Sequence, residues 1–260
     1  MHPVLFELPG LHLRIHLYGV MYALGVLLGL WVIRKESKRV GLSPEKMTDL
    51  LFYVLIAGTL GSRLLYILVE DPQTFLRPLE IFKLWKGGLV YYGGVIGAFF
   101  MIVYYCRRHR LSFWRVADVY VLGLAIGHAV GRIGCFFAGC CHGRTCDINA
   151  WYAVVFPDVP YGVAPPNIPL YPTQLLEFVG DLIIFVILLA LRRKKSFDGQ
   201  VFLLYVVLYG VMRSSIELLR GDAARGYVVP GLVSTSQFIS LVAVLAAIGV
   251  WIWRSRQNRK

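Results

Sequence analysis

Seven long runs of mostly apolar residues dominate the chain, and short segments that carry most of the charge separate them. The runs cover approximately residues 18–33, 49–70, 88–106, 115–137, 173–191, 199–219 and 234–253. A helix needs about 20 apolar residues to cross the bilayer, because it rises ~1.5 Å per residue through ~30 Å of hydrocarbon. The pattern therefore predicts an all-α polytopic membrane protein with about seven transmembrane helices.

Composition agrees with this pattern, because 57% of the residues are hydrophobic and only 16% are charged, which is unusual for a soluble protein. The longest polar segment, residues 138–172, contains the turn signal Pro165-Pro166-Asn167, and we expect it to form a small, irregular periplasmic head. We find no internal repeat, low-complexity stretch or linker that would divide the chain. Residues 1–260 are therefore expected to form a single transmembrane helical domain.

The net charge of +12 would suggest nucleic-acid binding in a soluble protein, but here the basic residues follow the order of the loops. Most of the 27 Lys and Arg lie in four segments, which are alternate loops of the chain: 34–48, 107–115, 192–195 and 254–260. The positive-inside rule places these segments in the cytoplasm, with the N-terminus outside and the C-terminus inside. No basic region precedes the first apolar run, so we expect no cleavable signal peptide.

Ionisable residues inside the predicted spans are informative, because they are costly in hydrocarbon and usually mark a functional site. With the predicted topology, five of them lie toward the periplasmic side: Arg63, Arg132, Glu177, Arg213 and Glu217. Helical spacing arranges two polar stripes, which are Tyr209-Arg213-Glu217-Arg220 and His128-Arg132-Cys135. We expect both stripes to face a common cavity.

Two interpretations of these polar residues are open. Arg213 and Glu217 could form a structural ion pair, and the tyrosines that open the first and third spans could belong to an ordinary aromatic belt. However, the intramembrane arginines outnumber the acids near them, and excess buried positive charge favours a bound anion. A phospholipid phosphate is the anion most available at this depth, and the guanidinium group binds phosphate in a bidentate manner.

Six segments match, in order along the chain, the motifs of one known protein family. The run Gly131–Gly143 (GRIGCFFAGCCHG) matches the signature GRxGNFxNxExxG in part. The other five correspond to HWYGLMY, GGR, WxGGxxFHGG, HPTQLYE and YGxxRxxxExxR, and they are His16–Tyr22, Gly61–Arg63, Trp85–Gly94, Tyr171–Glu177 and Tyr209–Arg220. By these motifs the chain resembles the prolipoprotein diacylglyceryl transferases over nearly its whole length.

The resemblance implies an enzyme of the bacterial inner membrane whose active site faces the periplasmic side. Such an enzyme would transfer the diacylglyceryl group from phosphatidylglycerol to the lipobox cysteine thiol of a prolipoprotein signal peptide. A thioether would form and glycerol-1-phosphate would be released. We expect no metal and no cofactor, and the expected partners are the two substrates and membrane lipid, without nucleic acid.

The resemblance also implies roles for individual residues. Tyr92, Arg132, Arg213 and Glu217 are the expected catalytic residues: the arginines would stabilise charge on the leaving phosphate, and Glu217 would orient Arg213. Tyr92 stands where the family commonly has a histidine, and His128 or His142 are the other candidate bases. A larger set is expected to bind substrate: Tyr18, Arg63, Arg132, Gly143, Tyr209, Arg213 and Arg220.

The signature departs from the family where Cys135, Ala138 and Cys140 replace Asn, Asn and Glu. With Cys141 and Cys146 close by, the cysteines could form disulfides, bind a metal or stay unpaired. The spacing C-x4-CCH-x3-C matches no standard zinc or haem pattern, and adjacent Cys140 and Cys141 are awkward ligands for one tetrahedral ion. The motif residues expected to bind an anion, such as Arg132 and Arg213, are thus kept. The positions expected to take part in proton transfer have changed.

Two other functions remain open from the residues alone. One is non-catalytic binding or transport of an anionic lipid, although a transporter should show repeats and interrupted helices. The other is a periplasm-facing thiol redox protein. A redox protein would depend on Cys140 or Cys141, whereas the transferase would depend on Arg213.

Overall fold

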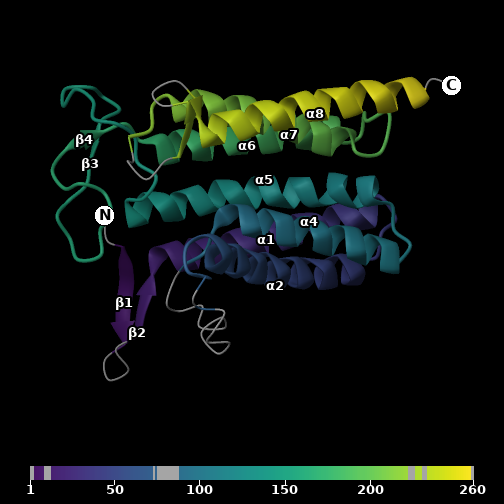
Figure 1. The fold of residues 1–260 in the computed structure, drawn as a ribbon, viewed down its shortest axis with the longest axis horizontal. Coiled ribbons are helices and arrows are strands. Elements are labelled where there is room, and N and C mark those ends of the chain that lie inside the picture. Colours follow the sequence, from purple (N-terminus) through teal and green to yellow (C-terminus); the bar gives the residue numbers. More distant parts are fainter. Residues whose placement is uncertain are drawn as a thin grey trace. The chain divides into compact units, whose positions relative to one another are not determined.

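The computed structural model describes residues 3–8, 13–72, 74, 88–221, 226–229 and 233–258. Seven helices account for most of them (Figure 1): α1 Leu17–Arg39, α2 Pro44–Val69, α4 Tyr91–Arg108, α5 Phe113–Ala138, α6 Thr173–Leu191, α7 Gln200–Glu217 and α8 Thr235–Gln257. Each predicted apolar run therefore lies on a helix. The bounds differ most at the end of α1 and the start of α2, where the helices continue into basic sequence. Trp85 to Gly87 of the third motif, and Arg259 and Lys260, lie outside the described residues.

Five of these helices are long and apolar enough to cross a membrane, and they are α1, α2, α5, α6 and α8. The other two, α4 and α7, have 18 residues each. Their last turns carry Arg107 and Arg108, and Glu217, which lower the hydropathy of a short helix. The helical membrane class is confirmed in this form, while seven spans and their orientation remain a prediction.

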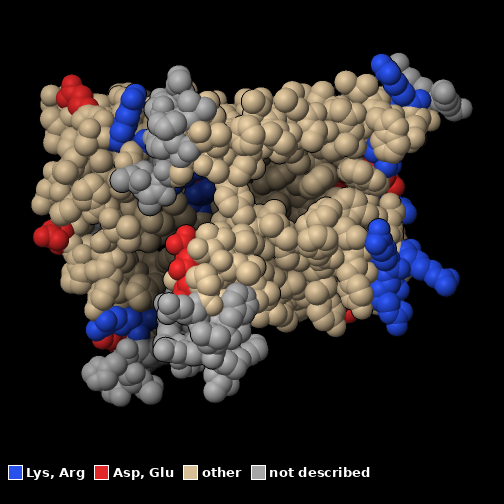
Figure 2. Space-filling model, in the orientation of Figure 1, with Lys and Arg blue, Asp and Glu red and all other residues tan. Residues whose placement is uncertain are grey.

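Apolar side chains are exposed along the helices, as expected for contact with lipid. The exposed fraction is 60% for Trp31, 65% for Phe100 and 60% for Leu245. Figure 2 shows that most side chains on the displayed face are neither acidic nor basic. Water would solvate such large apolar surfaces poorly, and hydrocarbon is the solvent that suits them.

The chain forms two compact units. The first comprises Met1–Val32 and Tyr120–Lys260, and the second comprises Ile33–Val119. In the first unit, side chains of α1, α5, α6 and α7 share one buried apolar core: Val32, Val121, Leu122, Ala125, Ile126, Ile184, Leu188, Val201 and Tyr205. This core fixes the helices that carry the polar stripes.

Glycines bring helix backbones together within each unit. In the first, a Cβ atom on Gly25 of α1 would lie 2.7 Å from the carbonyl oxygen of Gly127 of α5, a distance that real Cβ atoms do not reach. In the second, Gly61 of α2 and Gly93 of α4 face each other in the same way. These small residues therefore permit the close helix packing that is common in membrane proteins.

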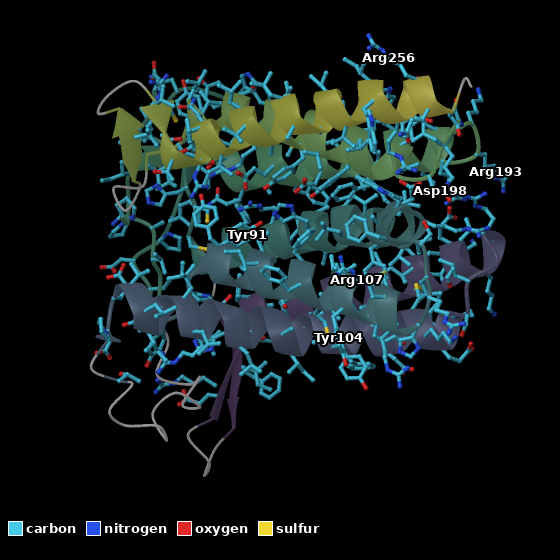
Figure 3. The ribbon with its side chains drawn as sticks, turned by 45° about the vertical axis from the view of Figure 1, so that its right-hand side comes forward. Tyr91, Tyr104, Arg107, Arg193, Asp198 and Arg256 are labelled. Atoms are coloured by element: carbon cyan, nitrogen blue, oxygen red, sulfur yellow. The ribbon has the colours of Figure 1, made fainter. Side chains whose placement is uncertain are left out.

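The basic segments gather at one end of the helices in each unit. In the second unit, Arg115 Nη2 donates to the Val40 carbonyl (2.6 Å) and Tyr105 Oη to the Lys46 carbonyl (3.1 Å). In the first unit, Arg193, Asp198 and Arg256 lie at the same end of α6, α7 and α8 (Figure 3). This grouping agrees with the predicted alternation of basic and non-basic loops.

Three short antiparallel hairpins were not predicted from the sequence. They pair β1 (Val4–Leu8) with β2 (Leu13–His16), β3 (Val154–Val155) with β4 (Pro169–Leu170), and β5 (Tyr227–Val229) with β6 (Val233–Ser234). Strands of two to five residues are too short to show a clear alternation of apolar and polar positions. The all-α class holds for the helical bundle, but these hairpins are an addition to it.

The segment after α5 is irregular, as predicted for residues 138–172. Its apolar side chains form a small cluster of their own, in which Phe156, Ala164 and Leu170 are buried. The β3–β4 pair closes this segment just before α6 begins. Within the first unit it therefore connects the end of α5 to the start of α6.

Candidate functional site

Glu177 of α6 lies at the centre of a buried ion-pair cluster in the first unit. Its Oε2 atom is 2.6 Å from Arg132 Nη1 on α5, and its Oε1 atom is 2.7 Å from Arg213 Nη1 on α7. Only 2% of the Glu177 side chain is exposed. One carboxylate therefore joins two arginines that are 81 residues apart in the sequence.

Two further residues complete the cluster. Arg213 Nη2 is 2.8 Å from Glu217 Oε2, and Arg220 Nη1 is 4.0 Å from Glu177 Oε1. The prediction that Glu217 holds Arg213 agrees with this geometry. Arg132, Arg213 and Arg220, which each carry a positive charge, thus bring three guanidinium groups to Glu177, and Glu217 adds a second carboxylate.

Arg132 retains an unused donor inside the cluster. Its Nε atom is buried and has no hydrogen-bond partner among the residues that the structure describes. A buried N–H group without a partner is costly, and this cost is removed when an acceptor binds. The arrangement is therefore suited to an anionic ligand.

The segment after α5 is held against the end of α7 by backbone hydrogen bonds. The Gly143 amide donates to the Tyr171 carbonyl (3.0 Å), and the Arg144 amide donates to the Leu219 carbonyl (2.8 Å). A Cβ atom at Gly143 would lie 2.6 Å from the Tyr171 carbonyl oxygen, so only glycine permits this approach. Gly143 thereby places Arg220, with which it forms a β-bridge, next to the cluster.

A second polar group lies deeper in the same helices. His128 Nδ1 of α5 is 3.3 Å from Asp181 Oδ2 of α6, and the His128 ring is 5.4 Å from the Tyr209 ring of α7. Tyr209 also stacks on Tyr205. His128 is thus held by a carboxylate and an aromatic ring, which is the arrangement of a structural histidine.

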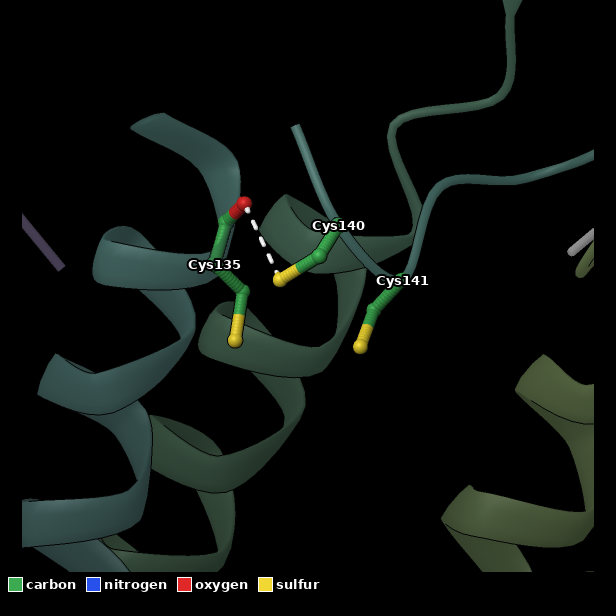
Figure 4. A group of neighbouring side chains, drawn as sticks. All are labelled: Cys135, Cys140 and Cys141. Carbon is green, nitrogen blue, oxygen red and sulfur yellow. Dashed lines mark hydrogen bonds between the residues drawn. The ribbon is translucent and has the colours of Figure 1, made fainter. Parts of the chain in front are cut away.

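Three cysteines lie beside this cluster at the end of α5. The sulfur atoms of Cys135, Cys140 and Cys141 are all within 4.8 Å of one another (Figure 4), and none of them forms a disulfide. Hydrogen bonds with the Cys135 and Cys140 thiols, together with the charges of Arg220 and Arg132, lower the pKa of Cys141. Hydrogen bonds with the Cys135 and Cys141 thiols, together with burial, raise the pKa of Cys140.

The other predicted site residues are divided between the two units. Tyr18 is in the first unit, where its backbone packs on Gly134, next to Cys135, and 46% of it is exposed. Arg63 and Tyr92 belong to the second unit. There, Arg63 is buried and donates to the Gly88 carbonyl (3.3 Å), whereas Tyr92 opens α4 beside Tyr91.

Sequence analysis did not assign a role in the site to Glu177, Thr173 or Gln174. Glu177 ends the Tyr171–Glu177 motif, so the signal was present in the sequence. Thr173 Oγ1 donates to the Cys141 carbonyl (2.7 Å) and Gln174 Nε2 to the Cys140 carbonyl (2.8 Å). Both side chains are fully buried, and they fix the cysteine segment to the start of α6.

Comparison with known proteins shows similarity along nearly the whole chain. A family model described as prolipoprotein diacylglyceryl transferase matches residues 3–253. A phosphatidylglycerol–prolipoprotein diacylglyceryl transferase of Clostridium tetani (strain Massachusetts / E88) is 39% identical over 100% of both chains. Proteins of the same name from Clostridium perfringens (strain 13 / Type A) and Pseudomonas paraeruginosa (strain DSM 24068 / PA7) are each 33% identical. The match with the Clostridium perfringens protein covers 100% of this chain and 98% of that protein. The match with the Pseudomonas paraeruginosa protein covers 95% of this chain and 91% of that protein.

Proposed function

Because the chain belongs to the prolipoprotein diacylglyceryl transferase family, we propose that it performs the transfer at the cluster formed by Arg132, Glu177, Arg213, Glu217 and Arg220. The chain is a transferase that moves a diacylglyceryl group from phosphatidylglycerol to a prolipoprotein. Family membership does not favour the lipid-transport and thiol-redox alternatives. The residues that perform the reaction are our proposal.

The acceptor in this proposal is the lipobox cysteine of a prolipoprotein signal peptide. Its thiolate attacks the glyceryl carbon that bears the phosphate ester. A carbon–sulfur bond forms, the carbon–oxygen bond breaks, and glycerol-1-phosphate leaves with the bonding electrons. The step therefore requires stabilisation of the leaving phosphate and removal of one thiol proton.

The single observation that carries the proposal is the unused donor of Arg132 inside a buried cluster of guanidinium groups. Three guanidinium groups share two carboxylates, and Arg132 Nε lacks a partner among the described residues. A phosphate oxygen would accept from Arg132 Nε and complete its hydrogen bonding. Donors held rigidly by ion pairs before the substrate arrives stabilise developing charge without reorganisation.

Glu177 and Glu217 serve this arrangement by holding the arginines in place. Arg213 contacts both carboxylates, one through each terminal nitrogen, so its guanidinium plane is fixed. Tyr209 and Gly143 would act around the cluster, since Tyr209 of α7 lies against the His128 ring of α5 and Gly143 pairs with Arg220. Tyr18, beside the cysteine segment, is proposed to line the lipid-binding region.

The thiol proton has three candidate acceptors. His128 is already paired with Asp181, and His142 Nδ1 contacts the Gly143 carbonyl (2.9 Å). Tyr92 remains our proposed proton acceptor by its position in the motif, with Arg63 as a substrate-binding residue. A positively charged site also favours the thiolate directly.

We place the reaction in the bacterial inner membrane, with the cluster toward the periplasmic side. The motivation is the grouping of basic segments at the opposite end of the helices, which the positive-inside rule assigns to the cytoplasm. Lipid and the hydrophobic signal peptide would both reach the cluster from within the membrane. The N-terminus is then outside and the C-terminus inside.

The experiment that tests the proposal is transfer from labelled phosphatidylglycerol to a lipobox-cysteine peptide by the purified full-length protein in detergent. The wild-type protein should produce equal amounts of lipidated peptide and glycerol-1-phosphate. Arg132→Ala and Arg213→Ala should each lose about a hundredfold or more in rate, the usual effect of removing one transition-state donor.

The matched control is Arg14→Ala, because Arg14 also pairs with a glutamate (Glu7, 3.0 Å) but is 38% exposed. This variant should keep its transfer rate. Normal turnover in Arg132→Ala and Arg213→Ala would reject the phosphate-binding role. If wild-type protein retains phosphatidylglycerol but forms no product, the lipid-binding alternative is favoured instead.

A further inference from the structure

Three sulfur atoms converge at the end of α5, in a group that the transfer reaction does not use. Those of Cys135, Cys140 and Cys141 all lie within 4.8 Å of one another. A metal–sulfur bond of about 2.3 Å would place the sulfurs of a tetrahedral or trigonal site about 3.8 to 4.0 Å apart. Side-chain rotations alone can therefore bring the three sulfurs to coordinating distance.

The backbone explains how adjacent cysteines can point to one place. Neighbouring side chains in an extended segment point to opposite sides, which makes Cys140 and Cys141 poor joint ligands when only the sequence is considered. However, Cys141 has a φ of 60° and Gly139 a φ of 73°. The left-handed conformation at Cys141 is uncommon for a residue with a side chain, and in this structure the Cys140 and Cys141 side chains extend to the same side as Cys135 (Figure 4).

The segment is also held rigidly. The fully buried Gln174 and Thr173 donate to the Cys140 and Cys141 carbonyls (2.8 and 2.7 Å). Cys135 is fixed by α5 itself, since the helix continues to Ala138. Rigid supporting contacts of this kind are what a metal site needs to keep its ligands in place.

We propose that Cys135, Cys140 and Cys141 bind one thiophilic metal ion, Cu(I) or Zn(II), through three thiolates. Thiolate sulfur is the ligand that both ions accept. With three sulfur ligands, Cu(I) would be trigonal, whereas Zn(II) would add a water molecule as its fourth ligand. None of the three ligands belongs to the set of arginines and glutamates that forms the phosphate-binding cluster, although Cys135 and Arg132 share α5.

The surrounding charge suits such a complex. Three thiolates with Cu(I) or Zn(II) carry a net charge of −2 or −1, and the positive charges of Arg220 and Arg132 act on this position. Binding would release up to three protons to solvent, one from each sulfur that is protonated beforehand. Three metal–sulfur bonds form, and no group is oxidised or reduced.

The test is metal binding by the purified full-length protein in detergent, after reduction and removal of metal with a chelator. Zn(II) and Cu(I) are titrated separately against a chromophoric competitor, and Co(II) serves as a spectroscopic probe through its sulfur charge-transfer absorption. We expect one ion per chain and release of protons. Cys135→Ser, Cys140→Ser and Cys141→Ser should each weaken binding by about a hundredfold or more, since even supporting contacts of a metal site are worth 10 to 100-fold.

The matched control is Cys146→Ser, because Cys146 lies in the same segment but outside the trio of sulfurs. Binding should be unchanged in this variant, and the ion that binds more tightly to the wild-type protein identifies the metal. Absence of a Co(II)–sulfur band, or equal binding in the trio variants, would overturn the proposal. Finding two of the three cysteines joined in a disulfide in protein isolated from membranes would also overturn it.

Discussion

Glu177 is surrounded by positive charge: the guanidinium groups of Arg132, Arg213 and Arg220 all lie within 4.0 Å of its carboxylate oxygens. A buried carboxylate of this kind neutralises charge and also sets the direction of each donor. Glu217 pairs with Arg213, four residues earlier on the same helix (2.8 Å). Glu177 therefore joins α6 to α5 and α7, whereas the Glu217–Arg213 pair lies within α7.

This difference leads to a prediction for Glu177→Gln. The amide keeps the size of the side chain but removes the charge, so three arginines lose their shared partner. Breaking a buried ion pair costs about 3 to 5 kcal/mol, and we expect a lower melting temperature and a loss of transfer activity of tenfold or more. Thermal unfolding in detergent and the transfer assay measure the two effects.

The comparison variant is Glu217→Gln, because Glu217 pairs with Arg213 of its own helix, whereas Glu177 joins α6 to two other helices. Its melting temperature and its transfer rate should both fall less than those of Glu177→Gln. An equal or smaller effect at Glu177 would contradict its central place in the cluster. The KM for phosphatidylglycerol should rise more in Glu177→Gln, since a misdirected Arg132 and Arg213 bind phosphate less well.

At this scale, sequence reasoning identified the arginines but not their common partner. Arg132, Arg213 and Glu217 follow from helical spacing and from the cost of charge in hydrocarbon. The direct contact of Glu177 with Arg132 and Arg213 depends on how α6 is rotated against α5 and α7, and spacing within one helix contains no such information.

At the scale of elements, the helices of the first unit depend on close backbone contact. α1 and α5 approach each other at Gly25 and Gly127, where a Cβ atom would lie 2.7 Å from a carbonyl oxygen. Without a hydrophobic driving force inside lipid, such contact is a main source of helix association. The α1–α5 contact also sets the position of Arg132 on α5.

We therefore predict that Gly25→Ala destabilises the protein by about 1 to 3 kcal/mol, the usual cost of overpacking. Gly249→Ala is the matched control, because Gly249 lies within α8 and nothing is within 4 Å of a Cβ atom there. The control should be unchanged or slightly more stable, since alanine favours helix. Thermal unfolding in detergent measures both, and equal stability of the two variants would show that the α1–α5 contact is not tight.

The elements that could be predicted are those that a long run of apolar residues encodes. Seven apolar runs became seven helices, whereas the three hairpins were missed because each strand has five residues or fewer. The pairing of β1 with β2 is a local event that a turn and a few backbone hydrogen bonds decide. Hydrophobic periodicity carries little information at that length.

At the scale of the whole molecule, the positive-inside rule predicts the orientation in the membrane from the basic segments. Asn149 and Ser196 are both exposed, the first in the segment after α5 and the second beside the basic segment 192–195. We predict that Asn149→Cys reacts with a membrane-impermeant maleimide in cells whose inner membrane is intact. Ser196→Cys should react only after that membrane is permeabilised, and labelling above the wild-type background is the measurement.

The reverse pattern of labelling would place the basic segments outside and would contradict the positive-inside assignment. Labelling of both positions in intact cells would indicate that α6, the helix between them, does not span the membrane. Since α6 alone separates Asn149 from Ser196 along the chain, the experiment also tests this helix as a span. The transfer rate of each variant, measured in parallel, shows whether the protein is folded.

The sequence by itself determined the membrane class, the positions of the helices and the resemblance to the transferase family, because these depend on local composition and on motifs that follow the order of the chain. The tertiary structure decided which side chains meet. Glu177 joins Arg132 to Arg213, and Cys141 turns back toward Cys135, through helix rotation and one left-handed residue. These are interactions between segments far apart in sequence, or unusual backbone geometry, and neither leaves a periodic pattern that can be read along the chain.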